Sequence, residues 1–324
     1  MNSNPEALAT SRTTWAVVLE KPEQLALNEL CLSEPTEEDV VVAMEWSAIS
    51  TGTERLLWSG SMPPFPGLGY PLVPGYESVG RITHAGLRSA RQVGERVFVP
   101  GARCFGDVKG LFGGAASRVV VPGSRVTPLE ERIGEQGVLL ALAATAYHAV
   151  SAKNCALPDL IIGHGVLGRL IARLTVILSA HAPVVWERNE TRSSGADRYA
   201  VVHPDSDNRR DYRAIYDVSG DSKILDSLIA RLGHGGEIVL AGFYNESLSF
   251  AFPAAFMREA RIRIAAEWRE ADLLAVKKLV ESGELNLDGL ITHRQEARSA
   301  PAAYRTAFTD PACLKMVLDW RALQ

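Results

Sequence analysis

One short stretch constrains the fold of this chain most strongly. An apolar run, Leu160–Ile162, leads into Gly163-His164-Gly165-Val166-Leu167-Gly168, which has the spacing Gly-x-Gly-x-x-Gly, and an apolar pattern with helical spacing follows. Gly163 permits the turn that leaves a strand, Gly165 has no side chain to keep phosphates away from the backbone, and Gly168 lets the helix lie close to the sheet. A pyrophosphate would then bind the unpaired N–H groups at the start of the helix. The stretch therefore predicts a strand, a turn and a helix that hold a dinucleotide.

An acidic residue ends the next predicted strand. Glu187 lies nineteen positions after Gly168, where a carboxylate can accept both hydroxyls of an adenosine ribose. A carboxylate there repels a 2′-phosphate, which favours NAD over NADP, whereas Arg188, the next residue, could receive that phosphate. Glu187 could also be a plain surface strand end. Within the turn, His164 could donate to a phosphate or point outward.

The residues around the glycine turn alternate between short apolar strands and helices. Strands are expected at 160–163, 183–187, 200–202, 214–219, 237–241 and 261–266, and helices at 167–178 and 222–232, with a glycine turn at 233–236. This alternation predicts an α/β fold with a doubly wound parallel sheet.

The first 125 or so residues have a different pattern, with short strands separated by turns rich in Gly and Pro. Strands are expected at 14–19, 25–30, 39–47, 77–83, 96–99 and 116–121, so this part is predicted to be all-β. The stretch 60–74 has too many prolines for a helix or a central strand. Its aromatic and aliphatic residues suit either contact with a flat apolar ligand or closure of the β core. A helix or helix pair is expected at 137–150, helices at 272–281 and 300–308, and a last strand at 313–319.

Composition excludes several classes of function. The chain has 324 residues and a formal net charge of -4, which gives no electrostatic reason to expect nucleic acid or an anionic membrane as a partner. We expect no transmembrane segment, because no run of about 18 apolar residues occurs, and the polar N-terminus has no hydrophobic signal core. The four cysteines are scattered without a Cys-x-x-Cys pair, which predicts buried thiols in a cytoplasmic protein.

Motifs along nearly the whole length resemble those of the medium-chain dehydrogenase/reductase superfamily. They are Ser47–Glu54, Val73–Gly80, Val93–Val97, Thr145–His148, the glycine turn, Asp217–Gly220 and Leu290–His293. The resemblance implies a GroES-like all-β domain at 1–145, a Rossmann NAD-binding domain at 146–270, and a segment at 271–324 that returns to complete the first domain. It also implies NAD contacts from Thr145, Ser219 and Gly242, and a homodimer formed through the nucleotide domain.

The superfamily's zinc ligands are not matched here. Zinc-dependent members have a cysteine, a histidine and a second cysteine at positions that correspond to Thr51, Tyr76 and Ala141, and only Glu77 beside them could bind a metal. One carboxylate cannot supply the three protein ligands of a catalytic zinc. The four-cysteine structural zinc lobe is missing too, with only Cys104 near its start. We therefore expect a member without metal.

Within the superfamily, the runs 49–60 and 62–80 resemble most the bacteriochlorophyllide a dehydrogenases of bacteriochlorophyll biosynthesis. That resemblance implies NAD-linked oxidation of the 3-(1-hydroxyethyl) group of a tetrapyrrole pigment to an acetyl group. A loop rich in Pro and aromatic residues suits such a planar apolar ring. The substrate contacts that we expect are Arg55, Phe65, Pro66 and Tyr70. Arg55, Arg103, Lys109 and Arg118 could meet a propionate carboxylate.

Oxidation of an alcohol without a metal requires a side chain that takes the hydroxyl proton. The candidates are Thr51, Thr53, Tyr76, Glu77 and His148. A pKa near neutrality favours His148, and a buried Glu77 with a raised pKa is equally reasonable. Two other functions stay open: a dehydrogenase without zinc for another apolar secondary alcohol or a quinone, and a non-catalytic module that binds nucleotide and pigment.

Overall fold

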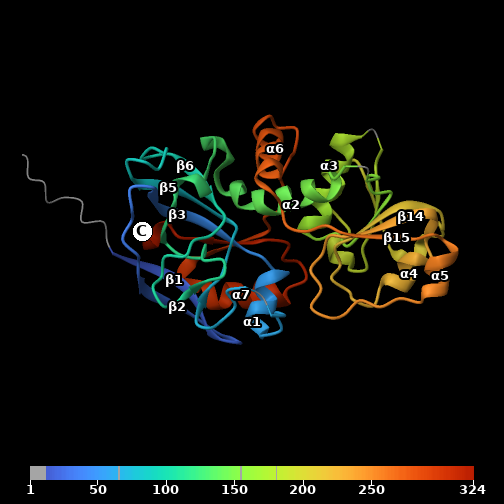
Figure 1. Cartoon of the computed structure of the whole chain (residues 1–324), viewed down its shortest axis with the longest axis horizontal. Helices are drawn as coiled ribbons and strands as arrows, with labels where there is room; N and C mark the ends of the chain where they lie inside the picture. The colour runs from blue at the N-terminus through green and yellow to red at the C-terminus, as the bar shows by residue number, and fades with distance from the viewer. Residues whose placement is uncertain (1–11, 65, 154, 180) are drawn as a thin grey trace, which may run out of the picture.

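The computed structural model describes residues 12–324 apart from 65, 154 and 180, and it has two lobes joined by helices (Figure 1). One lobe contains the N-terminal strands and the C-terminus. The other contains α3 (Val166–Leu178), α4 (Leu225–Ile229), α5 (Phe252–Met257) and one large sheet. In the described part of the chain, no helix is long and apolar enough to cross a bilayer.

The N-terminal lobe is built from two sheets. In the smaller sheet, of order β2-β1-β4-β7, β1 (Thr13–Lys21) pairs with β2 (Gln24–Cys31), and β4 (Leu72–Val73) lies between β1 and β7 (Lys109–Gly110). The larger sheet has the order β16-β17-β3-β5-β6-β9, with β8 also paired to β3. Its strands are β3 (Asp39–Ile49), β5 (Ser78–Ala85), β6 (Arg96–Val99), β8 (Arg118–Pro122), β9 (Thr127–Pro128), β16 (His293–Glu296) and β17 (Met316–Asp319).

The C-terminal strand completes the N-terminal sheet, as the superfamily resemblance implied. β17 pairs antiparallel with β3, with Met316 opposite Ile49 and Asp319 opposite Trp46. The helix α7 (Ala300–Thr309) packs beside it and contributes Tyr304 and Phe308 to the core of this lobe. Residues far apart in sequence, on β3, β5 and β17, therefore meet in one small region of the lobe.

The second lobe has the expected doubly wound sheet, with six parallel strands in the order β12-β11-β10-β13-β14-β15. The strands are β10 (Leu160–Ile162), β11 (Val184–Trp186), β12 (Ala200–Val202), β13 (Tyr212–Asp217), β14 (Leu232–Leu240) and β15 (Arg261–Ile264). The chain moves outward in one direction from β10 and in the other from β13. The carboxyl ends of these two neighbouring strands therefore form the topological switch point at which such sheets bind ligands.

Two predictions about local structure were wrong. The helix expected at 222–232 is only α4, because side chains first form turns: Ser219 accepts from the N–H of Asp221, and Asp221 accepts from the N–H of Lys223. The glycines at 233–236 do not form a separate turn but belong to β14, where the pairing with β13 shifts register. The short elements α1 (Thr53–Ser59), α5 and β16 were not predicted.

The helix that follows the Rossmann sheet packs against the helices next to that sheet. α6 (Glu270–Glu281) lies against α2 (Leu140–Val150), as Figure 1 shows, and its Leu273, Val276 and Val280 share a core cluster with α2 and α3. The chain then pairs with the N-terminal sheet through β16 and β17. The division of the chain at 145 and 270 stays a prediction.

Candidate active site

The glycine turn has the geometry of a phosphate cradle. Gly163 has φ +99°, which permits the turn at the end of β10, and a Cβ on Gly168 would lie 1.9 Å from the carbonyl oxygen of Gly163. A Cβ on Gly165 would have no protein atom within 4 Å. The open space beside Gly165 faces the first turn of α3, whose N–H groups, those of Val166 and Leu167 among them, have no partner within the helix. The turn fits a dinucleotide pyrophosphate.

Two more predicted cofactor residues lie beside this turn. A Cβ on Gly163 would be 3.7 Å from the backbone of Ser219, and a Cβ on Gly242 would be 3.3 Å from Val218 Cα. Ser219 follows β13 and Gly242 follows β14, so the fold brings the ends of three strands together. Their position at the switch point is where a dinucleotide extends across a doubly wound sheet.

The acid at the end of β11 lies over the same turn. Glu187 accepts hydrogen bonds from the backbone N–H of His164, at 3.0 Å, and of Asn189, at 2.8 Å. These bonds hold the carboxylate beside the glycine turn. The next residue, Arg188, is exposed.

The His164 side chain lies in neither of the two orientations expected. Its ring is fully buried, with Nδ1 2.6 Å from the carbonyl oxygen of Arg192 and Nε2 2.8 Å from the hydroxyl of Tyr199. Burial lowers its pKa from 6.5 to about 4, so the ring is neutral near pH 7. Because both nitrogens are occupied, this side chain braces the loop after β11 instead of donating to a phosphate.

The helix α2 connects the two lobes and presents two predicted site residues. The hydroxyl of Thr145 donates to the carbonyl oxygen of Ala141 one turn earlier, at 2.9 Å. His148 lies one turn after Thr145, and its Nδ1 is 2.8 Å from Asp272 Oδ2. The same carboxylate oxygen accepts from the N–H of Arg269 and caps α6. His148 therefore joins α2 to the start of α6.

Three hydroxyl groups meet in the N-terminal lobe around Tyr76, one of the positions that match the superfamily's zinc ligands. The phenol oxygen of Tyr76 is 2.5 Å from Ser50 Oγ and 3.5 Å from Thr53 Oγ1. Burial raises the pKa of Tyr76, and the nearby Glu77 carboxylate raises it further, so the phenol holds its proton near neutral pH. Thr51, half-buried in the turn between Ser50 and Thr53, precedes α1. Tyr76 also packs against the core cluster that contains Ala141.

A fully buried ion pair lies beneath these hydroxyls. Lys315, 2% exposed, donates to Glu77 Oε2 at 2.6 Å, and Glu77 is 0% exposed. The ammonium group of Lys315 also donates to the carbonyl oxygen of Ile49. Burial raises the pKa of Glu77, and the charge of Lys315 opposes this shift. The other carboxylate oxygen, Oε1, is buried and accepts no hydrogen bond among the described residues.

A second buried carboxylate lies beside the pair. Glu54 accepts from the N–H of Ser50 at 2.9 Å and from the hydroxyl of Tyr304 at 2.6 Å. Burial raises its pKa from 4.5 to about 7, and these hydrogen bonds oppose the shift. The site floor thus combines two carboxyl groups with one ammonium group.

The raised pKa of Glu54 predicts a loss of stability with rising pH. Below the unfolded-state pKa of 4.5 the carboxyl is neutral in both states; as pH rises to about 7, ionisation favours the unfolded chain. This contribution amounts to about 3 kcal/mol of unfolding free energy. Denaturant unfolding at pH 5 and pH 8 should show that Glu54→Gln, which keeps the shape, removes this part of the pH dependence. Equal pH slopes for the two proteins would contradict it.

The donor set at this site does not fit a zinc ion. Among the residues that the structure describes, no group of three or more His, Cys, Asp or Glu side chains could hold a metal. Thr51 and Tyr76 offer neutral hydroxyls, Ala141 offers no donor, and one oxygen of Glu77 is already paired with Lys315. No step of the chemistry below is therefore assigned to a metal.

The predicted substrate loop packs around a small apolar cluster next to Tyr76. Met62, Leu68 and Tyr70 contact Leu57, Leu72 and Leu111, and the Tyr70 hydroxyl donates to the carbonyl oxygen of Leu57. Phe112 belongs to the same cluster and meets the ring of Tyr76 edge-on, with centroids 5.3 Å apart. An aromatic wall therefore runs from the loop to the hydroxyl cluster.

The other predicted substrate residues surround this wall. Arg55 on α1 and Pro66 are exposed, and Phe65 lies outside the described residues. The ammonium group of Lys109 lies against Gly69 of the loop: a Cβ added to Gly69 would be 2.9 Å from Lys109 Nζ. Arg103 is exposed and Arg118 is half-buried on β8. Lys109 is thus the cation among these that the structure places against the loop.

Four residues of this site were missed at the sequence level: Ser50, Glu54, Phe112 and Lys315. Ser50 and Glu54 lie within the motif Ser47–Glu54, so only their roles went unrecognised. Lys315 had a detectable signal, since a single lysine in the apolar run 313–318 predicts a buried charge that needs a partner. Phe112 is followed directly by Gly113 and Gly114, and this local pattern gave no hint of a site.

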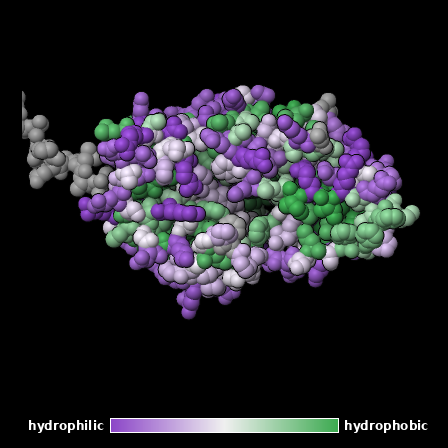
Figure 2. All heavy atoms as spheres, in the orientation of Figure 1, coloured by the Kyte–Doolittle hydropathy of each residue, from purple (hydrophilic) through white to green (hydrophobic). Residues whose placement is uncertain are grey.

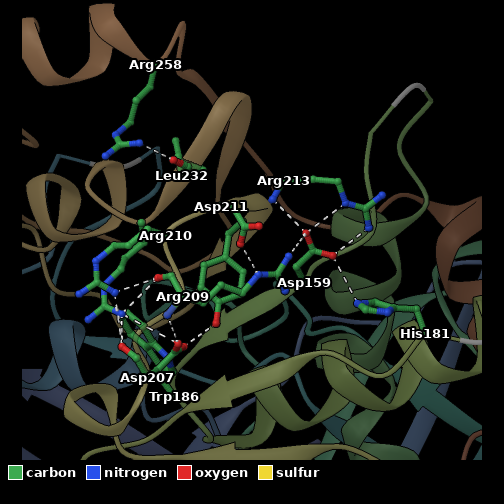
Figure 3. Close-up of polar contacts among 12 residues, drawn as sticks. Asp159, His181, Trp186, Asp207, Arg209, Arg210, Asp211, Arg213, Leu232 and Arg258 are labelled. Carbon is green, nitrogen blue, oxygen red and sulfur yellow. Dashed lines mark hydrogen bonds and ion pairs between the residues drawn. The ribbon is translucent and has the colours of Figure 1, made fainter.

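Another polar cluster lies at the opposite end of the Rossmann strands (Figure 3). Asp159, which precedes β10, accepts from the backbone N–H and the guanidinium of Arg213 at 2.9 Å, and His181 and Arg209 lie near it. Burial raises the pKa of Asp159, but the hydrogen bonds from Arg213 outweigh it and hold the pKa below its usual range. Because ligands of such sheets bind at the carboxyl ends of the strands, this cluster is structural.

The surface is hollowed between the two lobes (Figure 2). Such an interdomain position is typical of small-molecule sites. A nucleotide site on one lobe and a hydroxyl and carboxylate network on the other can together bind two reactants.

Comparison with known proteins places the chain in a family. Residues 36–131 match the alcohol dehydrogenase GroES-like domain. A 2-desacetyl-2-hydroxyethyl bacteriochlorophyllide A dehydrogenase from Rhodobacter capsulatus is 55% identical over 309 residues, which cover 95% of this chain and 98% of that protein. The chain belongs to the medium-chain dehydrogenase/reductase family.

Solved structures show the same medium-chain dehydrogenase/reductase fold. A short chain alcohol dehydrogenase from Escherichia coli CFT073 complexed with NADH has a TM-score of 0.81 at 22% identity, covering 95% of this chain and 100% of that one. A dehydrogenase from Sinorhizobium meliloti 1021 bound to NADP has a TM-score of 0.78 at 20% identity, covering 95% and 99%. The predicted fold class, a GroES-like β domain with a Rossmann sheet, is confirmed.

Proposed function

We propose that this protein oxidises the hydroxyethyl group of a bacteriochlorophyllide to an acetyl group with a nicotinamide cofactor, as a step of bacteriochlorophyll biosynthesis. The supporting observation is the 55% identity, over 95% of the chain, to a protein with the name of that dehydrogenase. The open cradle at Gly165 and the aromatic wall at Phe112 and Tyr76 suit the two ligands that such a reaction needs.

The chain's own residues bind and orient the reactants. The glycine turn and the start of α3 would hold the pyrophosphate, and Glu187 the adenosine ribose. When bound, the nicotinamide accepts a hydride from the alcohol carbon. Tyr76 and Thr53 offer hydroxyls that can bind the alcohol oxygen, and Lys109 would meet a propionate of the pigment. We place His148 outside the proton transfer, because it is occupied by Asp272.

The test is turnover by the purified, chelator-treated protein, with a hydroxyethyl bacteriochlorophyllide and NAD as substrates. We expect the pigment spectrum to change to that of the acetyl product while NADH absorbance rises. Pigment and nucleotide binding without turnover would instead support a non-catalytic module. Oxidation of other apolar alcohols, or reduction of quinones, with no reaction of the pigment would assign another substrate.

The same experiment tests the proposed independence from metal. We infer that the reaction needs no zinc, because the site offers hydroxyls and one lysine-paired carboxylate in place of a ligand set. Activity should persist after chelation, with no stoichiometric metal in elemental analysis. Loss of activity that zinc restores would overturn this inference and leave the proposed reaction intact.

We also infer that NAD is preferred over NADP. The Glu187 carboxylate is held over the glycine turn by two backbone N–H groups, where its charge would repel a 2′-phosphate. Glu187→Ser should raise KM for NAD about 10- to 100-fold, the effect of losing charged hydrogen bonds to the ribose. It should also reduce the preference for NAD over NADP. In the control, Arg188→Ala should leave KM for NAD within about twofold. A preference for NADP in the natural protein would contradict the inference.

We propose that two copies associate through the edge of the Rossmann sheet. β15 is the edge strand, and the exposed side chains on it and on α5 are largely apolar, including Phe252, Phe256, Met257 and Ile264. Figure 2 shows hydrophobic surface over this lobe. An unpaired apolar edge favours pairing with a second strand. Sedimentation should give a dimer that Ile264→Lys converts to a monomer, whereas a monomeric natural protein would exclude the proposal.

We propose a cytoplasmic location. All four cysteines are unpaired, and three of them are at least partly buried. This state of the thiols is typical of proteins in a reducing compartment.

A further inference from the structure

A buried arginine lies beneath the loop that follows β11. Arg169, at the start of α3, is 4% exposed. Its Nε donates to the carbonyl oxygen of His164 at 3.0 Å. Its two terminal nitrogens donate to three carbonyl oxygens of the loop, those of Arg192, Gly195 and Ser194, at 3.0, 3.1 and 2.7 Å. One side chain therefore joins the glycine turn to the loop.

All four of these acceptors are main-chain oxygens, and they define what the guanidinium adds to the site. Burial lowers the pKa of Arg169 from its usual value, but an arginine keeps its charge near neutral pH. Burying a cation is costly unless its donors find acceptors. A guanidinium is a planar fork with five N–H donors, so it can bind several carbonyl oxygens at once, which no neutral side chain and no lysine can do in the same way.

The loop above this arginine has little regular structure of its own. Residues 193–198 are exposed and belong to no helix or strand. Gly195 has φ +80°, and a Cβ there would lie 2.5 Å from Arg169 Nη1, so the loop backbone lies directly on the guanidinium. The buried ring of His164 supports the same loop. The shape of this exposed segment therefore depends on two buried side chains.

The loop begins with the acid predicted to bind the adenosine ribose. Glu187 Oε1 accepts from the N–H of Asn189, which caps the short turn Glu190–Arg192. The last carbonyl oxygen of that turn is one of those that Arg169 binds. Glu187 Oε2 accepts from the N–H of His164, whose carbonyl oxygen Arg169 also binds. Both hydrogen bonds that orient Glu187 thus lead to groups that Arg169 holds.

We propose that Arg169 is a positioning residue that fixes this loop for the adenosine half of the cofactor, and so determines how strongly the protein prefers NAD to NADP. The inference rests on the proposed use of a nicotinamide cofactor, and it names what controls the choice between the two forms. Arg169 acts through Glu187. When the loop is released, the carboxylate can turn toward water, so that NAD loses its ribose contacts and the 2′-phosphate of NADP is repelled less.

The charge of Arg169 would have a different effect from its fork. A cation at the start of α3 lies near the place where the pyrophosphate would bind, and it would attract NAD and NADP equally. A substitution that keeps the charge and removes the fork separates the two effects. Lysine is such a substitution, because its ammonium group is a single point at the end of a flexible chain.

The test measures the binding of NADH and NADPH by fluorescence titration, which needs no pigment. Arg169→Lys should raise Kd for NADH about 10-fold and leave Kd for NADPH within about threefold, since charged hydrogen bonds to the ribose are lost only in NADH. In the Glu187→Ser background, Arg169→Lys should change Kd for NADH by less than about twofold, because it acts through that carboxylate. Amide hydrogen exchange in 189–195 should rise about 10-fold in Arg169→Lys.

Arg173 gives a matched control one turn later on α3. It is 7% exposed and donates to the carbonyl oxygens of Asn286 and Asp288, which follow α6. Arg173→Lys removes a buried fork from the same helix, so a general loss of α3 packing would appear in both variants. It should keep Kd for NADH within about twofold and leave hydrogen exchange in 189–195 unchanged.

A second variant reaches the same contact from the exposed side. Gly195→Ala places a Cβ against Arg169 Nη1 and displaces the loop from the guanidinium, while the buried arginine and the sheet stay intact. It should show the same selective loss of NADH affinity as Arg169→Lys, about 10-fold. This variant keeps the proposal testable if Arg169→Lys does not fold.

The proposal is overturned if Arg169→Lys or Gly195→Ala binds NADH as tightly as the natural protein. It is also overturned if Arg169→Lys weakens NADH and NADPH equally, or if its effect multiplies with that of Glu187→Ser. Equal losses in Arg169→Lys and Arg173→Lys would assign the effect to the packing of α3 instead. Failure of the proposed function is a separate result, in which the natural protein binds NADH but does not oxidise the pigment.

Discussion

A Gly165→Val variant is expected to lose at least about 100-fold of its affinity for the nicotinamide cofactor and still fold. A Cβ at this position meets no protein atom within 4 Å, and the backbone φ of -74° suits any residue. The added side chain would occupy the space where the pyrophosphate approaches the start of α3. Losing two hydrogen bonds to a charged group is enough for this effect. Titration of NADH fluorescence measures it.

The neighbouring glycine provides a contrast. Gly168→Ala would bring its Cβ to 1.9 Å from the carbonyl oxygen of Gly163, so α3 must move away from β10. This variant should lose thermal stability as well as cofactor binding. Gly165→Val should lose only about 1 kcal/mol, because Gly165 is the N-cap of α3 and valine is a poor cap. Normal cofactor binding by Gly165→Val would refute the assignment of the cradle.

Local pattern was enough to predict the nucleotide half of the site. Gly163, Gly165 and Gly168 lie within one turn of chain, and Glu187 follows at the end of the next strand, so their spacing in sequence reflects their spacing in the fold. The same holds for the strands of the Rossmann sheet, whose apolar runs bury both faces. These features depend on residues that are close in sequence or related by a regular crossover.

The other half of the site could not be predicted in the same way, because it depends on long-range contacts. Lys315, just before β17, meets Glu77, just before β5, and Tyr304 on α7 meets Glu54 on α1. Nothing local to Glu77 indicates that its partner lies 238 residues later. The role of His164 was missed for the same reason, since its partners Arg192 and Tyr199 lie in the loop beyond the next strand.

The short α4 shows the limit of periodicity as a guide. Apolar residues at helical spacing predicted a helix over 222–232, but the hydrogen bonds of Ser219 and Asp221 to nearby N–H groups compete with the first turn. The strand β14 then begins at Leu232, because that residue already pairs with Tyr212 of β13. Tertiary pairing thus determines where the helix ends.

The second large effect is expected from Lys315→Met. This substitution leaves the carboxylate of Glu77 fully buried without its counter-charge, and it should lower the free energy of unfolding by about 3–5 kcal/mol at pH 7. The loss should grow as pH rises, because Glu77 would then have a pKa raised further by burial, and ionisation would favour the unfolded state. Urea unfolding monitored by circular dichroism measures the change.

Replacing both partners separates the cost of an unpaired charge from the value of the pair. In Glu77→Met/Lys315→Met no charge is left without a partner, and an apolar pair of similar volume is often neutral or stabilising. Most of the stability lost in Lys315→Met should therefore return in the double variant.

A partly exposed ion pair with the same N–O distance gives the control. Lys277 Nζ is 2.6 Å from Glu281 Oε2 on α6, but its side chain is 24% exposed and that of Glu281 13%. Solvent screens such a helical pair, so Lys277→Met should cost less than about 1 kcal/mol. If Lys315→Met were no more destabilising than Lys277→Met, the Glu77 site would be hydrated in solution.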